Sequence, residues 1–228
     1  MLTLRQTQCL DVMGVERWVR RRTAAELVAT PVSGEAVLDE GTVASLEVLA
    51  VRVARCVSCE LHRTRTQTVF GVGNGTADLL IVGEAPGAEE DRRGEPFVGR
   101  AGQLLNEMLR AIGLDRKSVY IANILKCRPP SNRDPRPEEV AHCSDFLTHQ
   151  IELIQPQAMV AVGRIAAQNL LNSTQSIGRL RGDIHRFGDR QIPLIVTYHP
   201  AYLLRQPSEK RKSWQDLLAV KRLLEELR

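Results

Sequence analysis

Four short apolar runs that alternate with helical patterns constrain the fold of this chain more than any other feature. The runs lie at 79–82, 119–125, 158–162 and 192–196, and the helical patterns at 101–112, 137–154, 165–171 and 214–227. Short strands that are apolar on every residue are buried on both faces, and their alternation with helices indicates βαβ units. The sequence therefore predicts an α/β fold: a three-layer α/β/α sandwich with a central four-stranded parallel sheet.

Polar residues and glycines directly follow these predicted strands. In open α/β sheets, ligands bind beyond the carboxyl ends of the strands. The residues found there are Glu84 within the GEAPG loop 83–87, Asn123, Arg164 and His199. We expect this acid, amide, arginine and histidine to converge on one edge of the sheet.

Four of the five cysteines form a candidate metal site. Cys56 and Cys59 make a CxxC pair, and Cys127 and Cys143 lie farther along the chain, whereas Cys9 is expected to be a bystander. Four thiolates can bind either zinc or a cubane iron–sulfur cluster, and the spacing alone leaves both open. The alternative is four unrelated buried thiols.

Composition limits the partners and the cellular location that we expect for the protein. A net charge of +4 permits a nucleic-acid partner without demanding one. No apolar run reaches the roughly 18 residues of a membrane span, and the N-terminus lacks the apolar stretch of a signal peptide. We expect a cytoplasmic monomer with no membrane partner, in which 1–42 is an extension and linker and 43–228 is the main domain.

Three longer segments resemble the family-4 uracil-DNA glycosylases, the iron–sulfur class of the uracil-DNA glycosylase superfamily. They are GEAPGAEEDRRGEPFVGRAGQLL at 83–105, IANILKCRPPSNRDPRPEEVAHC at 121–143 and YHPAYLLRQPSEKRKSWQDL at 198–217. The resemblance implies an enzyme that hydrolyses the bond between uracil and deoxyribose in DNA and leaves an abasic site. It also implies a [4Fe–4S] cluster on Cys56, Cys59, Cys127 and Cys143. A covalently trapping subgroup carries an insertion that 123–143 lacks, so the chain is similar to the hydrolytic members.

The resemblance also implies two catalytic residues. His199 would donate a hydrogen bond to uracil O2, where negative charge grows as the bond breaks. Glu84 would orient the attacking water or stabilise the cationic sugar. Sequence alone does not assign the charge state of His199.

The uracil-binding residues implied by the resemblance surround a base that is flipped out of the DNA. Phe97 would stack on the ring, and Asn123 would accept from N3–H and donate to O4, the opposite of what cytosine presents. Glu90 or Asp91 would crowd C5 and exclude thymine. The main chain would approach the base through Gly83, Glu84, Ala85 and Pro86.

Contacts to single- or double-stranded DNA are expected after His199. Tyr202, Leu203 and Leu204 are predicted to form an exposed wedge that enters the base stack, and Arg205 would bind phosphate. The alternative is a first helical turn with its apolar side on the core.

Two other functions compete with uracil excision. One is a glycosylase of the same fold that prefers hypoxanthine. The other is a non-catalytic DNA-binding iron–sulfur protein, which has no need for the combined set of Glu84, Phe97, Asn123 and His199.

Overall fold

The fold is built on one six-stranded sheet. The structure, a computed structural model, describes residues 45–227, so the predicted extension at 1–42 lies outside the described residues, as does Cys9. The strand order is β1-β3-β2-β4-β6-β5. The strands are β1 (Val72–Gly73), β2 (Leu79–Gly83), β3 (Tyr120–Asn123), β4 (Ala158–Val162), β5 (Ile184–Phe187) and β6 (Ile192–Thr197).

The four central strands are parallel, as the sequence predicts. β2 pairs in parallel with β3 and β4, and β4 pairs in parallel with β6. Every residue of these four strands is buried. The α/β class with its four-stranded parallel centre is therefore confirmed.

Two antiparallel edge strands extend the predicted sheet. β1 has only two residues and pairs with β3, and β5 pairs with β6. Burial alternates along β5 between exposed and half-buried, so this strand lacks the continuous apolar signal that marks the centre. Neither edge gives a strong signal in the sequence.

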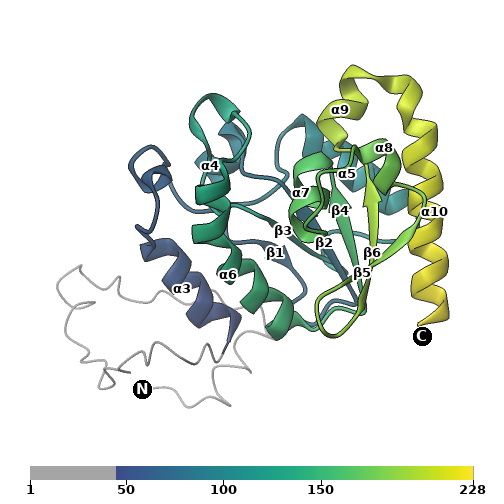
Figure 1. The fold of residues 1–228 in the computed structure, drawn as a ribbon, viewed down its shortest axis with the longest axis horizontal. Coiled ribbons are helices and arrows are strands. Elements are labelled where there is room, and N and C mark those ends of the chain that lie inside the picture. Colours follow the sequence, from purple (N-terminus) through teal and green to yellow (C-terminus); the bar gives the residue numbers. More distant parts are fainter. Residues whose placement is uncertain (1–44, 228) are drawn as a thin grey trace, which may run out of the picture. The chain divides into compact units, whose positions relative to one another are not determined.

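Helices cover both faces of the sheet (Figure 1). They are α3 (Leu46–Arg55), α4 (Ala88–Arg93), α5 (Arg100–Ala111), α6 (Pro137–Ile154), α7 (Arg164–Leu170), α8 (Ile177–Leu180), α9 (Pro200–Arg205) and α10 (Lys210–Glu226). Helix α6 begins at Pro137, a residue suited to the first helical position, and the Glu139 side chain accepts a hydrogen bond from the Arg136 amide. The helix ends at Ile154 and is capped by Gln155, which takes the left-handed conformation common at helix ends.

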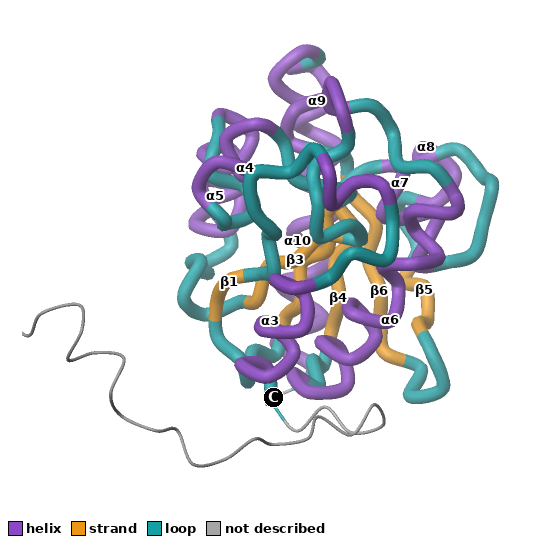
Figure 2. Tube along the Cα trace, turned by 90° about the vertical axis from the view of Figure 1, so that its left-hand side faces the viewer, coloured by secondary structure: helices purple, strands orange, loops and turns teal. Residues whose placement is uncertain are grey.

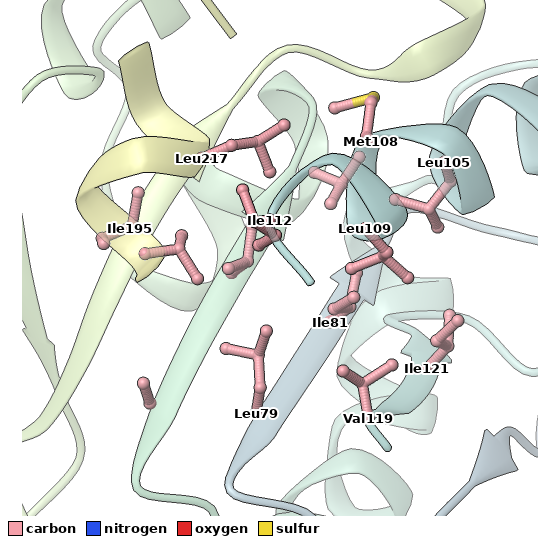
Figure 3. Close-up of a cluster of buried hydrophobic side chains, with 14 of the residues drawn as sticks. Leu79, Ile81, Leu105, Met108, Leu109, Ile112, Val119, Ile121, Ile195 and Leu217 are labelled. Carbon is pink, nitrogen blue, oxygen red and sulfur yellow. The ribbon is translucent and has the colours of Figure 1, made fainter. Parts of the chain in front are cut away.

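Alternate residues of each central strand pack on opposite faces, which produces the three layers. On one face, Ile81 and Ile195 pack in a cluster with Leu109 of α5 and Leu217 of α10 (Figure 3). On the other face, residues such as Leu80 pack in a second cluster with α6 and α7. Helix α3 packs against α6, and Figure 2 shows both on the viewer's side of the sheet.

The parallel register brings the ends of distant strands together. Gly83 at the end of β2 lies opposite Asn123 at the end of β3, and Val162 lies opposite Thr197. The Gly163 amide donates to the Thr197 carbonyl at 2.9 Å. The loops that follow these strands therefore share one edge. Separately, none of the helices within 45–227 combines the length and apolar character needed to cross a bilayer.

Candidate functional site

A cavity of about 450 Å³ opens at the carboxyl edge of the sheet. Segments far apart in the sequence form its wall: the loop after β2, the turn before α5, the end of β3, the loop 129–134 and the start of α9. The lining includes many of the residues predicted from sequence, namely Glu84, Ala85, Pro86, Phe97, Asn123, His199 and Arg205. The structure thus brings these side chains together, while their individual roles stay predictions.

Gly83 is not among the residues that line the cavity. A Cβ at this position would be 2.4 Å from Asn123 Oδ1 and 2.6 Å from Phe97 Cζ. Such contacts are far inside van der Waals distance, so only a glycine lets both side chains close over the strand end. Gly83 therefore shapes the site through its lack of a side chain.

Asn123 presents a buried polar atom that has no partner within the described residues. The residue is 2% exposed, and its Oδ1 accepts no hydrogen bond. Leaving a buried acceptor unsatisfied costs about 1–3 kcal/mol. Because Asn123 lines the cavity, a ligand with a suitable N–H group would relieve this cost.

Lys126 lies behind Asn123, and sequence reasoning missed it. This lysine is 1% exposed, and its ammonium donates to the Asn123 carbonyl at 2.8 Å and to Gln150 Oε1 at 2.5 Å. Burial lowers the Lys126 pKa to about 8. The signal that could have revealed it is a single lysine at the end of the apolar run IANIL.

His199 is held as a neutral imidazole with a defined tautomer. Its Nδ1 accepts from the Ala201 amide at 3.1 Å and caps the N-terminus of α9. Burial lowers the His199 pKa to about 4, and the positive charge of Arg205 adds to the shift, whereas Glu90 opposes it. At neutral pH the remaining proton therefore sits on Nε2, which is a hydrogen-bond donor.

Phe97 lies beside His199 in the cavity. The two ring centroids are 5.6 Å apart and the ring planes differ by 30°. Phe97 is 6% exposed and also belongs to the main core cluster, so its ring is fixed by packing. A planar ligand in this cavity would meet one aromatic ring and one imidazole donor.

Glu84 is a carboxyl group whose charge is disfavoured by its surroundings. Burial raises the Glu84 pKa to about 7, and Asp134 contributes in the same direction, whereas Arg164 opposes both. Arg164 is not among the lining residues, and its guanidinium pairs with Asp134 at 2.6 Å. Arg164 is the one predicted strand-end side chain of the four that does not line the cavity. It influences two residues that do, because it pairs with Asp134 and its charge opposes the rise in the Glu84 pKa.

The structure separates the two candidates for crowding a ring substituent. Glu90 lines the cavity, and its Oε1 accepts from the Val98 and Gly99 amides at 3.0 and 3.1 Å. Asp91 is 3% exposed, is not in the lining, and accepts from the amide and hydroxyl of Thr66. Asp91 is therefore wrongly placed to crowd C5 of a bound pyrimidine.

The predicted wedge residues Tyr202, Leu203 and Leu204 lie in helix α9, and the prediction for one of them is wrong. Pro200 at the first position and the His199 cap start α9 directly after the last strand. Leu203 is 1% exposed and packs in the core, so the prediction that it is exposed is wrong. Leu204 is 37% exposed and Tyr202 is half-buried against Tyr198, with ring centroids 5.0 Å apart.

The four predicted ligand cysteines line one small cavity. Cys56, Cys59, Cys127 and Cys143 are all free thiols. Burial raises the Cys143 pKa to about 11 and also raises the pKa of Cys59 and of Cys127. Within 45–227, no group of three or more histidine, cysteine, aspartate or glutamate side chains is arranged to hold a metal ion.

Hydrogen-bond donors already face two of these sulfurs. Arg65 Nη1 donates to Cys127 Sγ at 3.0 Å, and the Lys126 amide donates to Cys143 Sγ at 3.3 Å. Such donors stabilise the thiolate form, which is the form that ligates metals. In their chemistry, though not in their present arrangement, four thiols with these donors suit a thiolate-ligated group. Arg65 was missed because its role depends on a contact between distant segments.

Comparisons with known proteins agree with this arrangement. The model of the "Uracil DNA glycosylase superfamily" matches residues 70–218. The chain is 46% identical to a "Type-4 uracil-DNA glycosylase" of Archaeoglobus fulgidus over 77% of this chain and 92% of that protein. It is 47% identical to a "Type-4 uracil-DNA glycosylase" of Thermotoga maritima over 72% of this chain and 86% of that protein. A "Type-5 uracil-DNA glycosylase" of Pyrobaculum aerophilum is 33% identical over 58% of this chain and 64% of that protein.

Proposed function

This chain belongs to the uracil-DNA glycosylase superfamily, and we propose that it is a DNA-repair enzyme that hydrolyses the N-glycosidic bond of uracil in DNA. The products are free uracil and an abasic site. The observation that carries the proposal is the unpartnered Asn123 Oδ1 in a cavity that also holds Phe97 and neutral His199.

Uracil recognition depends on the Watson–Crick edge of a flipped-out base. Asn123 Oδ1 accepts from uracil N3–H, while its amide group donates to O4. Cytosine has no hydrogen on N3 and carries a donor in place of O4, so both contacts are lost. Each unpaired buried group costs about 1–3 kcal/mol, which supports discrimination of ~10² or more. Phe97 stacks on the same ring and contributes a further ~1–3 kcal/mol to binding.

His199 stabilises the departing base. As the bond breaks, negative charge spreads over uracil N1 and O2, and the Nε2–H of the neutral imidazole donates to O2. The donor is preorganised, because Nδ1 is already occupied by the Ala201 amide. No proton has to be taken up from solvent for this role.

Glu84 acts on the sugar side of the bond. Its carboxylate stabilises the cationic sugar and orients the water that attacks C1′. Both roles require the ionised form, so the Glu84 pKa of about 7 makes the fraction of active enzyme depend on pH near neutrality. Glu90, at the cavity wall, excludes the methyl group of thymine.

DNA contacts extend from the cavity along α9. Arg205 lines the cavity and is exposed, which supports a role in pairing with a phosphate. The exposed Leu204, with Tyr202 beside it, fills the gap left by the flipped base. We propose that the protein acts as a monomer and accepts uracil in single- or double-stranded DNA.

We further propose that Cys56, Cys59, Cys127 and Cys143 hold a [4Fe–4S] cluster. Thiolates are the ligands that such clusters use, and all four cysteines line one small cavity, which supports this proposal. The bound cluster supplies a crosslink rather than redox chemistry. The chain between Cys127 and Cys143 contributes Asn132 to the uracil cavity, so this crosslink anchors one of its walls.

Alkaline cleavage of treated oligonucleotides tests the function. The purified protein is incubated with strands that carry a single uracil, cytosine, thymine or hypoxanthine, and abasic sites are then cleaved with alkali. We expect cutting at uracil alone. Cutting at hypoxanthine but not uracil supports the same fold with another base preference, and binding without any cutting supports a non-catalytic DNA-binding protein.

A further inference from the structure

The turn that carries Phe97 has a backbone conformation that needs support. Phe97 has a φ of +54°, in the left-handed region that bulky side chains rarely adopt. This conformation aims the ring at the cavity beside His199. Such a residue persists only when surrounding contacts fix it, and these contacts are therefore part of the site.

Arg116 holds the carbonyl side of this turn. Its Nη2 donates to the Pro96 carbonyl at 2.7 Å, and its Nη1 donates to the Phe97 carbonyl at 3.2 Å. Nη1 also reaches Asn106 Oδ1 of α5 at 3.3 Å. Arg116 comes from the loop between α5 and β3 and is not among the residues that line the cavity.

The other side of the turn is fixed by separate contacts. Glu90 Oε1 accepts from the Val98 and Gly99 amides. Helix α5 packs so closely on the turn that a Cβ at Gly102 would be 1.7 Å from the Phe97 carbonyl oxygen. Hydrogen bonds thus engage every one of these backbone groups: the carbonyls of residues 96 and 97 and the amides of residues 98 and 99. Among the described residues, Arg116 is the only side chain that donates to the two carbonyls.

We propose that Arg116 is a positioning residue for uracil, which acts by holding Phe97 in its stacking orientation. The guanidinium is suited to this role because its planar fork can reach two consecutive carbonyls at once. A lysine offers a single ammonium and lacks this geometry. The inference rests on the proposed function, since it assigns the positioning of the aromatic ring that stacks on the base.

A purely structural role for Arg116 makes a different prediction. Because Asn106 and the turn are both tied to this arginine, its loss could lower the thermal stability of the whole domain without any specific effect on uracil. Two affinities distinguish these roles. Binding of free uracil requires the Phe97 ring, whereas abasic-site DNA has no base to stack on it. A positioning role therefore lowers only the affinity for free uracil.

The experiment compares Arg116→Met and Arg116→Lys with the matched control Arg110→Met. Arg110 is an exposed arginine of α5 that pairs only with Glu107 among the described residues, at 2.8 Å. The inhibition constant of free uracil is measured in the cleavage assay, the dissociation constant of abasic-site DNA by fluorescence anisotropy, and Tm by circular dichroism. Each Arg116 variant is also combined with Phe97→Ala.

We expect Arg116→Met to raise the uracil inhibition constant about fivefold or more, because part of the stacking contribution is lost. Arg116→Lys should give a smaller increase, and Arg110→Met none. Affinity for abasic-site DNA should stay within about twofold, and Arg116→Met should add nothing in the Phe97→Ala background, since coupled residues are not additive.

An unchanged inhibition constant overturns the proposal, as does an additive effect with Phe97→Ala or an equal loss of affinity for uracil and abasic-site DNA. If Arg116→Met does not fold at the assay temperature, the same comparisons are made with Arg116→Lys. If the unaltered protein neither cuts uracil-containing DNA nor responds to free uracil, the proposed function itself fails. Cleavage by the unaltered protein with an unchanged Arg116→Met inhibition constant rejects only the role of Arg116.

Discussion

The rings of Phe97 and His199 lie side by side in the cavity, with their centroids 5.6 Å apart. Phe97 precedes α5, and His199 caps α9, so two segments distant in sequence supply the proposed stacking surface and the proposed hydrogen-bond donor. Both can therefore contact one pyrimidine at the same time.

Asn123→Leu should separate base recognition from fold stability. Replacing the amide leaves the uracil N3–H without an acceptor, so kcat/KM for uracil should fall by roughly 10- to 100-fold. The Tm should not fall in parallel, because Oδ1 makes no hydrogen bond in the free protein. Steady-state kinetics and thermal melting of one preparation test this. A drop in Tm with unchanged kcat/KM would show that Asn123 is a structural residue.

Activity should rise with pH through about 7, the pKa of Glu84. In the proposed mechanism the ionised carboxylate of Glu84 is the active form, whereas His199, with a pKa of about 4, is already neutral below that range. A pH profile of kcat/KM should show one inflection near neutrality, which Glu84→Gln removes together with most of the activity. An inflection that persists in Glu84→Gln would assign it to another group.

Glu84 should also make the stability of the protein fall as pH rises. Its folded-state pKa of about 7 lies above the ordinary value of 4.5, so its contribution to stability is fully present below the ordinary value. That contribution is lost as pH rises through the folded-state pKa. Between about pH 5 and pH 8, the Tm of the unaltered protein should therefore decline relative to that of Glu84→Gln. Parallel Tm curves for the two proteins would contradict this.

Leu203 and Leu204 should behave differently although they are adjacent. Leu203→Ala removes a fully buried side chain and should lower the free energy of unfolding by about 2–5 kcal/mol. Leu204→Ala should leave stability nearly unchanged and weaken excision from double-stranded DNA more than from single-stranded DNA, because only the duplex needs its gap filled. Urea unfolding and paired excision assays measure the two effects. Equal loss on both DNA forms would remove Leu204 from the wedge.

The cysteine site should contain iron. Protein purified without oxygen should hold about four iron atoms and little zinc. Cys143→Ser should lose most of the iron and reduce excision, because the loop that lines the cavity is no longer anchored, whereas Cys9→Ser should retain both. Metal analysis and visible absorbance give the answer. One zinc per chain without iron would replace the cluster with a zinc site.

The centre of the fold could be predicted from sequence because its strands are apolar on every residue. The edge strands could not, since β1 has two residues and β5 alternates in exposure. The site was predictable to the extent that parallel strands end at one edge, which brings Glu84, Asn123 and His199 together.

Other parts of the site depend on contacts that only the folded chain reveals. Arg116 binds two backbone carbonyls, and such contacts leave no pattern in the sequence. The difference between Leu203 and Leu204 depends on where α9 begins, because adjacent residues of a helix point in different directions. The cap formed by His199 settles that register.

A crystal structure with free uracil bound tests the central claim most directly. We predict that the ring lies against Phe97, with N3 within hydrogen-bond distance of Asn123 Oδ1 and O2 within reach of His199 Nε2. Uracil bound elsewhere, or bound in this cavity with Asn123 Oδ1 still unpartnered, would contradict the account.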